Sequence, residues 1–86
     1  MLLLGRTVTK EEVQHVINNS DYTDEKEVVL DMLEKIAKCS TIKDWENWKD
    51  IPVDSIWIAR SKKAKADVYY NYSEKFYFLI KEGGKI

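Results

Sequence analysis

Cysteine, histidine, proline and glycine are all scarce in this chain of 86 residues. Because Cys39 is the only cysteine, the chain cannot form an intramolecular disulfide, which argues against a disulfide-stabilised secreted domain. One cysteine and one histidine are also too few soft ligands for a Cys/His zinc site. We therefore expect no metal site and no cofactor, and the unpaired thiol favours a reducing, cytoplasmic location.

The sequence patterns of common catalytic sites are also absent. Gly83 and Gly84 have no helix after them, so they do not form a phosphate-binding loop. His15 has no serine or cysteine at a spacing that would make it the general base of a nucleophile. Asp54 and Asp67 lack the acid-x-Lys spacing of a metal nuclease, because position 69 is a tyrosine. These absences favour a protein that is not an enzyme and has no catalytic residues.

Long apolar segments and low-complexity stretches are missing too. The apolar start, Met1 to Leu4, ends at Gly5 and Arg6, and it is far shorter than a signal-peptide core or a membrane span. Hydrophobic residues make up 44% of the chain and charged residues 34%, a balance typical of a globular protein rather than a disordered one. We expect a single domain over residues 1–86, with no membrane partner.

Charge is distributed unevenly along the chain. Residues 1–54 contain seven Lys or Arg against twelve Asp or Glu, whereas residues 55–86 contain seven against three. The first part is therefore acidic and the second basic, although the net charge is only −1. Such asymmetry can direct a polyanion to one side of a protein, but side chains that merely face solvent would give the same composition.

The first half of the chain predicts a strand followed by helices. Residues 2–8 are a short apolar run, and Thr9 with Glu12 forms a capping box that starts a helix. Thr23 or Asp24 is expected to cap a second helix, in which apolar residues recur at helical spacing. A short third helix is predicted from residue 40 or 41, because Ile42, Trp45 and Trp48 would then share one side.

Three runs rich in β-branched and aromatic residues follow, and they predict a three-stranded antiparallel meander. Pro52 separates them from the helices, since it disfavours helix at the preceding residue. The runs span residues 53–60, 66–72 and 76–81. The expected fold class is therefore α+β, with an N-terminal strand, two main helices, a short third helix and helices packed on one sheet face.

The register of the last hairpin is open to two interpretations. A three-residue turn places Tyr70 on the same face as Phe76 and Phe78. A two-residue turn places Tyr69 there instead, because a shift of one residue exchanges the two faces. We prefer the first register, since it gives a wholly apolar core face and leaves Tyr69 and Tyr77 on the other face.

The predicted core consists of residues that fall on the apolar side of their elements. These are Val13, Val16, Ile17, Val29, Leu33, Ile36, Ile56, Ile58, Phe76 and Phe78.

The main candidate site is a basic loop beside aromatic residues. Four cations lie between positions 60 and 65, and such residues bind phosphates without regard to sequence, although a basic loop is also a common soluble turn. Aromatic rings on an open sheet face can stack unpaired bases. The candidate nucleic-acid-binding residues are Arg60, Lys62, Lys63, Lys65, Tyr69, Tyr77 and Trp57. We expect a small non-enzymatic, regulatory binding module that contacts RNA or single-stranded DNA.

Two other functions are compatible with the sequence. The acidic helical surface of residues 11–34 would suit an inhibitor or accessory factor that binds a basic protein partner. The predicted order of a strand, helices and three strands is similar to that of microbial ribonuclease toxins of the RelE type. This resemblance in topology, which includes no shared motif, implies that Arg60, Lys62 and Tyr70 would handle a scissile phosphate. The acidic helices differ from the strongly basic surfaces of those toxins.

Overall fold

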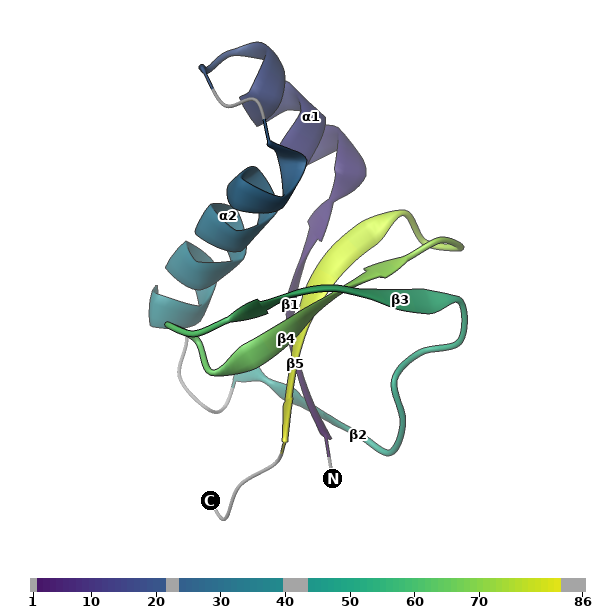
Figure 1. Cartoon of the computed structure of the whole chain (residues 1–86). Coiled ribbons are helices and arrows are strands. Elements are labelled where there is room, and N and C mark those ends of the chain that lie inside the picture. Colours follow the sequence, from purple (N-terminus) through teal and green to yellow (C-terminus); the bar gives the residue numbers. More distant parts are fainter. Residues whose placement is uncertain (1, 22–23, 40–43, 83–86) are drawn as a thin grey trace.

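The computed structural model describes residues 2–21, 24–39 and 44–82, which form two helices and one antiparallel sheet (Figure 1). The five strands of the sheet lie in the order β2-β1-β5-β4-β3. The elements are β1 (Leu2–Thr9), α1 (Lys10–Asn18), α2 (Glu25–Cys39), β2 (Glu46–Trp48), β3 (Ser55–Ser61), β4 (Ala66–Asn71) and β5 (Phe76–Glu82). The predicted α+β class, with two helices and an antiparallel sheet, is confirmed.

Capping residues set the starts of both helices. The backbone amide of Glu12 donates to Thr9 Oγ1 at 3.1 Å, so Thr9 ends β1 and caps α1 as predicted. The amide of Lys26 donates to Asp24 Oδ1 at 3.0 Å, which identifies Asp24 as a capping residue of α2. Thr23, the other predicted cap, lies outside the described residues.

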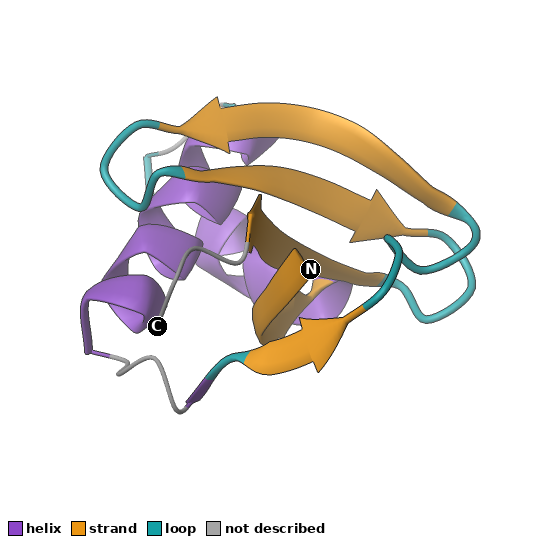
Figure 2. Ribbon diagram, turned by 90° about the horizontal axis from the view of Figure 1, so that it is seen from below, coloured by secondary structure: helices purple, strands orange, loops and turns teal. Residues whose placement is uncertain are grey.

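Both helices pack on one face of the sheet, which we call the helix face (Figures 1 and 2). Val13 of α1 and Leu33 of α2 are completely buried there, and they pack with apolar side chains of the sheet. The buried members of this cluster are Leu3, Val8, Val13, Val28, Val29, Leu33, Trp45, Ala66, Val68, Tyr77 and Leu79. This cluster is the main hydrophobic core.

A second apolar cluster lies on the opposite face of the sheet. Its buried members are Leu4, Phe78 and Ile80. Figure 2 shows how strongly the sheet curls, with the β3–β4 hairpin on one side and β2 on the other. The segment of residues 49–54 joins β2 to β3, and Ile51 from this segment packs against the cluster. Phe78 is therefore completely buried by the curved sheet and this segment, although neither of the two described helices packs on this face.

The predicted short third helix is not confirmed, because Asp44 is the single helical residue between α2 and β2 among the described residues. Residues 40–43 lie outside them, and residues 46–48, which we assigned to its end, form strand β2 instead. Leu2 pairs with Trp48 and Leu4 with Glu46, so β2 satisfies the backbone groups along one edge of β1. Trp45 is buried and Trp48 is exposed, so the two rings do not share one side.

The preferred register of the last hairpin is wrong by one residue. Tyr69 pairs with Phe78 and Asn71 with Phe76, which is the alternative that placed Tyr69 on the face of the phenylalanines. Asn71 provides the physical reason, because its side-chain oxygen accepts the amide of Glu74 at 2.9 Å and its carbonyl accepts the amide of Lys75. These bonds fix a turn over residues 72–75.

Most of the predicted core lies in the interior, with one clear exception. Val13, Val29, Leu33 and Phe78 are buried, although Phe78 belongs to the second cluster. The half-buried members are Val16, Ile17, Ile36, Ile58 and Phe76. Ile56 is 40% exposed, so its assignment to the core is wrong. It lies on β3, an edge strand of the sheet, and the pairing of β3 with β4 is irregular between Trp57 and Ala59.

Candidate nucleic-acid interface

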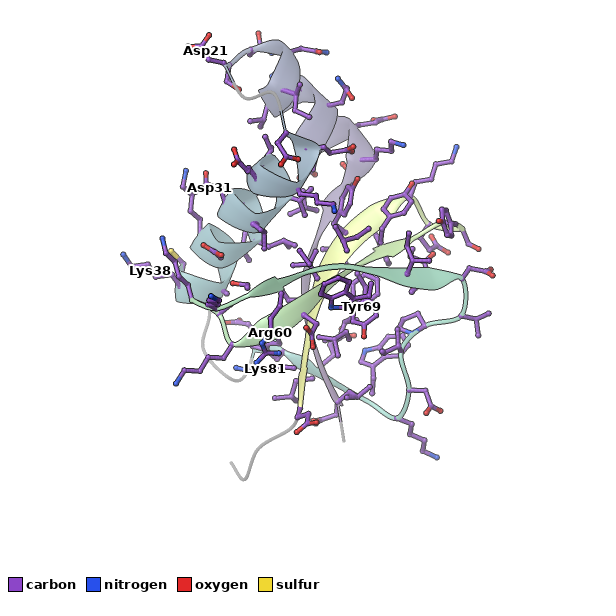
Figure 3. All side chains as sticks on the ribbon, in the orientation of Figure 1. Asp21, Asp31, Lys38, Arg60, Tyr69 and Lys81 are labelled. Carbon is purple, nitrogen blue, oxygen red and sulfur yellow. The ribbon has the colours of Figure 1, made fainter. Side chains whose placement is uncertain are left out.

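The β3–β4 hairpin brings two aromatic and two charged side chains to one surface. Trp57 pairs with Tyr69, and Arg60 pairs with Asp67, so these side chains lie on the sheet face turned away from the helices. We call this surface of Trp57, Arg60, Asp67 and Tyr69 the hairpin face. Figure 3 shows Arg60 and Tyr69 below the hairpin, on the side away from α1.

Asp67 orients two neighbours on the hairpin face. Its Oδ1 accepts the indole N–H of Trp57 at 3.1 Å, and its Oδ2 lies 3.4 Å from Nη1 of Arg60. The Trp57 side chain remains 57% exposed, so the ring is held in position while most of it faces solvent. The carboxylate is balanced by one guanidinium, so Asp67 adds little net negative charge to this surface.

Tyr69 forms the inner part of the hairpin face. Its ring stacks on Phe78 with a centroid separation of 6.0 Å and an interplanar angle of 18°. Because Phe78 is fully buried and Tyr69 is half-buried, Tyr69 is anchored to the second apolar cluster. The hairpin face thus combines one anchored ring with one largely exposed ring.

The lysine-rich turn of residues 62–65 closes the same hairpin. Lys62, Lys63 and Lys65 are all exposed, and Lys65 has a left-handed backbone with φ 53°. Ser61 anchors the turn, since its hydroxyl accepts the amide of Ala64 at 3.1 Å and donates to Glu34 of α2 at 2.9 Å. Our sequence reasoning missed Ser61, because a single serine at a strand end carries no pattern that marks it as an anchor.

Tyr77, a predicted site residue, lies on the other face of the sheet. It is only 6% exposed beneath the helices, and its hydroxyl donates to Glu25 Oε1 at 2.6 Å. Burial, together with this hydrogen bond to a carboxylate, raises the pKa of Tyr77 above its ordinary value. Tyr77 therefore does not join Trp57 and Tyr69, and the expectation that it shares a face with Tyr69 is wrong.

The three residues implied by the resemblance to ribonuclease toxins are not brought together on one face. Tyr70 packs against the helix-face core, with its ring centroid 4.7 Å from that of Tyr77. Arg60 lies on the hairpin face, and Lys62 lies in the turn. The sheet therefore separates the Tyr70 ring from the Arg60 guanidinium.

Within residues 2–21, 24–39 and 44–82, no group of three or more His, Cys, Asp or Glu side chains is arranged to hold a metal ion. Neither of the two described helices has the length and apolar character needed to cross a membrane.

Comparison of this chain with protein-family models, with curated proteins and with solved structures gave no match.

Proposed function

We propose that the hairpin face and the lysine-rich turn bind single-stranded nucleic acid, either RNA or DNA, without cleaving it. The observation that carries the proposal is the exposed Trp57 ring, which Asp67 holds beside Arg60 and Tyr69. A fixed and exposed aromatic ring can stack a base without losing much conformational freedom on binding. The turn lysines supply the positive charge that a phosphate backbone needs.

The proposed contacts divide into two kinds. Trp57 and Tyr69 are the stacking residues, and a base would lie against the exposed side of Trp57. Arg60, Lys62 and Lys65 are the phosphate-binding residues, since they lie on the hairpin face or in the turn that follows it. Stacking contacts depend weakly on salt, whereas phosphate contacts release counterions and depend on it strongly.

Trp57 and Trp48 form a matched pair for testing the stacking contact. Both rings are exposed, and the indole N–H of Trp48 donates to Glu46 at 3.2 Å much as that of Trp57 donates to Asp67. Trp57→Ala is expected to weaken binding of a labelled single strand by roughly 1–3 kcal/mol with little change in salt dependence. Trp48→Ala, on β2, should leave binding unchanged. Fluorescence anisotropy measures both, and equal losses would contradict the assignment of the site to the hairpin.

The phosphate contacts are tested by changing charge at the turn. Replacing Lys62 and Lys65 with Gln should reduce the slope of log K against log salt by roughly 0.7 per lost contact on a single strand. Shortening of the labelled strand on a denaturing gel would favour the ribonuclease alternative. If no strand binds even at low salt, the proposal fails, and the acidic helical surface of residues 11–34 becomes the better candidate for a protein partner.

A further inference from the structure

A second basic surface lies on the helix side of the same hairpin. It is a groove of about 630 Å³ between α2, Trp45, the turn of residues 62–65 and the end of β5. Four lysines and two carboxylates line it, and we call it the lysine groove. These residues are Lys35, Lys38, Lys63, Lys81, Asp31 and Glu34. Figure 3 labels Asp31, Lys38 and Lys81, which come from the helix and from the last strand.

The two carboxylates of the lysine groove are already engaged. Asp31 forms an ion pair with Lys35 at 3.1 Å, and Glu34 accepts the hydroxyl of Ser61 at 2.9 Å. Within the part of the chain that the structure describes, Lys38, Lys63 and Lys81 form no ion pair with a carboxylate. Among the described residues, these three ammonium groups from three different elements therefore have no ion-pair partner. Glu34 keeps its negative charge, because its hydrogen bond comes from a neutral hydroxyl, so the four lysines and two carboxylates of the lining give a net charge of +2.

Trp45 holds Lys81 at the groove. The Lys81 Nζ lies 4.3 Å from the centroid of the Trp45 ring, a distance typical of a cation–π contact. The ring itself packs on Gly5 of β1, where a Cβ atom would lie only 3.0 Å from the nearest ring carbon. Gly5 thus lets the ring lie against the sheet, and the ring fixes the position of the lysine.

The presence of all three lysines is not explained by the end of α2 alone. A lysine near a helix C-terminus interacts favourably with the partial negative charge there, which accounts for Lys38. Lys63 and Lys81 belong to a turn and a strand, and their charges add to that of Lys38 in one groove. Because four lysines face only two carboxylates in the groove, the repulsion between the lysines is only partly offset, and a bound anion reduces it further.

We propose that the lysine groove binds a chain of phosphates, supplied either by a nucleic-acid backbone or by free linear polyphosphate. Three ammonium groups on different walls suit several linked phosphates better than one small anion. This site lies on the opposite side of the hairpin from Trp57 and Tyr69, so it does not require the aromatic contacts proposed above.

Inorganic tripolyphosphate is the probe that tests the groove. Titration into the ¹⁵N-labelled protein at low salt should shift the backbone amides of Ala37, Lys63 and Ala64, which line the groove. Replacing Lys38, Lys63 and Lys81 together with Gln should weaken this binding roughly tenfold.

The matched control replaces Lys10, Lys26 and Lys49 with Gln. These three lysines are exposed and lie outside the groove, and their replacement changes the net charge by the same amount. Binding should then weaken by less than about twofold, since only long-range, screened attraction is lost. Equal losses in the two triple variants, or no shift of the groove amides in the parent, would overturn the proposal.

A second titration identifies the source of the phosphates. If an oligothymidylate shifts the groove amides, including that of Ala37 on α2, which lies outside the turn of residues 62–65, and competes with tripolyphosphate, the natural ligand class is the nucleic-acid backbone. If tripolyphosphate alone shifts them, it is free polyphosphate. Trp57→Ala separates this site from the hairpin face, because it should leave tripolyphosphate binding unchanged even if the first proposal fails.

Discussion

The two faces of the sheet are covered in different ways. On the helix face, α1 and α2 supply a second layer, and Leu33 from α2 fills the centre of the core. The opposite face has no helix among the described residues, yet Phe78 on that face is as fully buried as Leu33. Curvature of the sheet and the segment of residues 49–54 provide its cover (Figure 2). A short, strongly bent sheet can therefore build two apolar clusters with helices on only one side.

Truncation of one large side chain in each cluster tests whether the two clusters stabilise the fold equally. Phe78→Ala is expected to lower the free energy of unfolding by roughly 3–5 kcal/mol and Leu33→Ala by roughly 2–5 kcal/mol, because each leaves a cavity at a fully buried position. Urea denaturation measures both, and Ile56→Ala at an exposed position is the control. If Phe78→Ala costs no more than Ile56→Ala, the second cluster contributes little and the comparison breaks down.

Asn71 ties the segment that covers the second cluster to the turn between β4 and β5. Its buried side-chain nitrogen donates to Val53 O at 2.9 Å and to Ser55 Oγ at 3.0 Å, and its oxygen accepts the amide of Glu74. Asn71→Ala leaves these groups without their partner, so we expect a loss of roughly 1–3 kcal/mol of stability.

Ser73→Ala is the control for Asn71. Its hydroxyl donates to Asp54 at the exposed surface, where water can replace the lost bond. Thermal denaturation of the two variants should separate them, and similar melting temperatures would show that Asn71 does not hold residues 53–55 in place.

Removal of the cap at the start of α1 should destabilise the helix layer by a smaller amount than the core substitutions. Thr9→Ala removes the acceptor for the Glu12 amide and should lower stability by about 1 kcal/mol. Thr9→Ser keeps the hydroxyl and should recover most of the loss. Circular dichroism during urea denaturation measures both, and an equal loss in the two variants would assign the effect to the lost methyl group instead of the cap.

The buried hydroxyl of Tyr77 makes the helix face sensitive to alkaline pH. Its pKa is raised in the folded protein, so the unfolded chain loses this proton first, at an ordinary pKa of about 10. The stability it contributes is therefore fully present below about pH 10 and decreases as the pH rises further. Tyr77→Phe should reduce the fall in stability between about pH 9 and 11. Tyr72→Phe, at an exposed ring, should not, and identical pH profiles for all three proteins would contradict this role.

Local signals made the helices and the basic hairpin predictable. Thr9 and Glu12 mark the start of α1, and the apolar stripe of α2 has a period that no strand shares. The turn of residues 62–65 follows from its run of lysines. Trp57 was expected on the face away from Ile58 because side chains alternate along a strand, and the structure places it there.

The hairpin register and strand β2 were beyond the reach of the same reasoning. Residues 76–80 of β5 are all apolar, so alternation cannot show which of them face the helices, and the side-chain bonds of Asn71 decide the register instead. Trp45 and Trp48 have a helical spacing by coincidence, because pairing with β1 at a distant point in the chain makes residues 46–48 a strand. Because every residue from 76 to 80 is apolar, Tyr77 was also assigned to the wrong face of the sheet.

The position of β1 inside the sheet, next to the edge strand β2, has a consequence for the order of folding. β1 lies between β2 and β5, and its pairing with β5 joins Thr9 to Phe76 and Leu2 to Glu82. Strands β3, β4 and β5 are joined by short turns, so these local hairpins can form early at a small loss of chain entropy. Pairing of β1 with β5 must close nearly the whole chain into a loop, and contacts between residues so distant in sequence slow folding. We therefore expect β1 to pair with β5 late in folding, so its apolar side chains remain exposed to solvent until then.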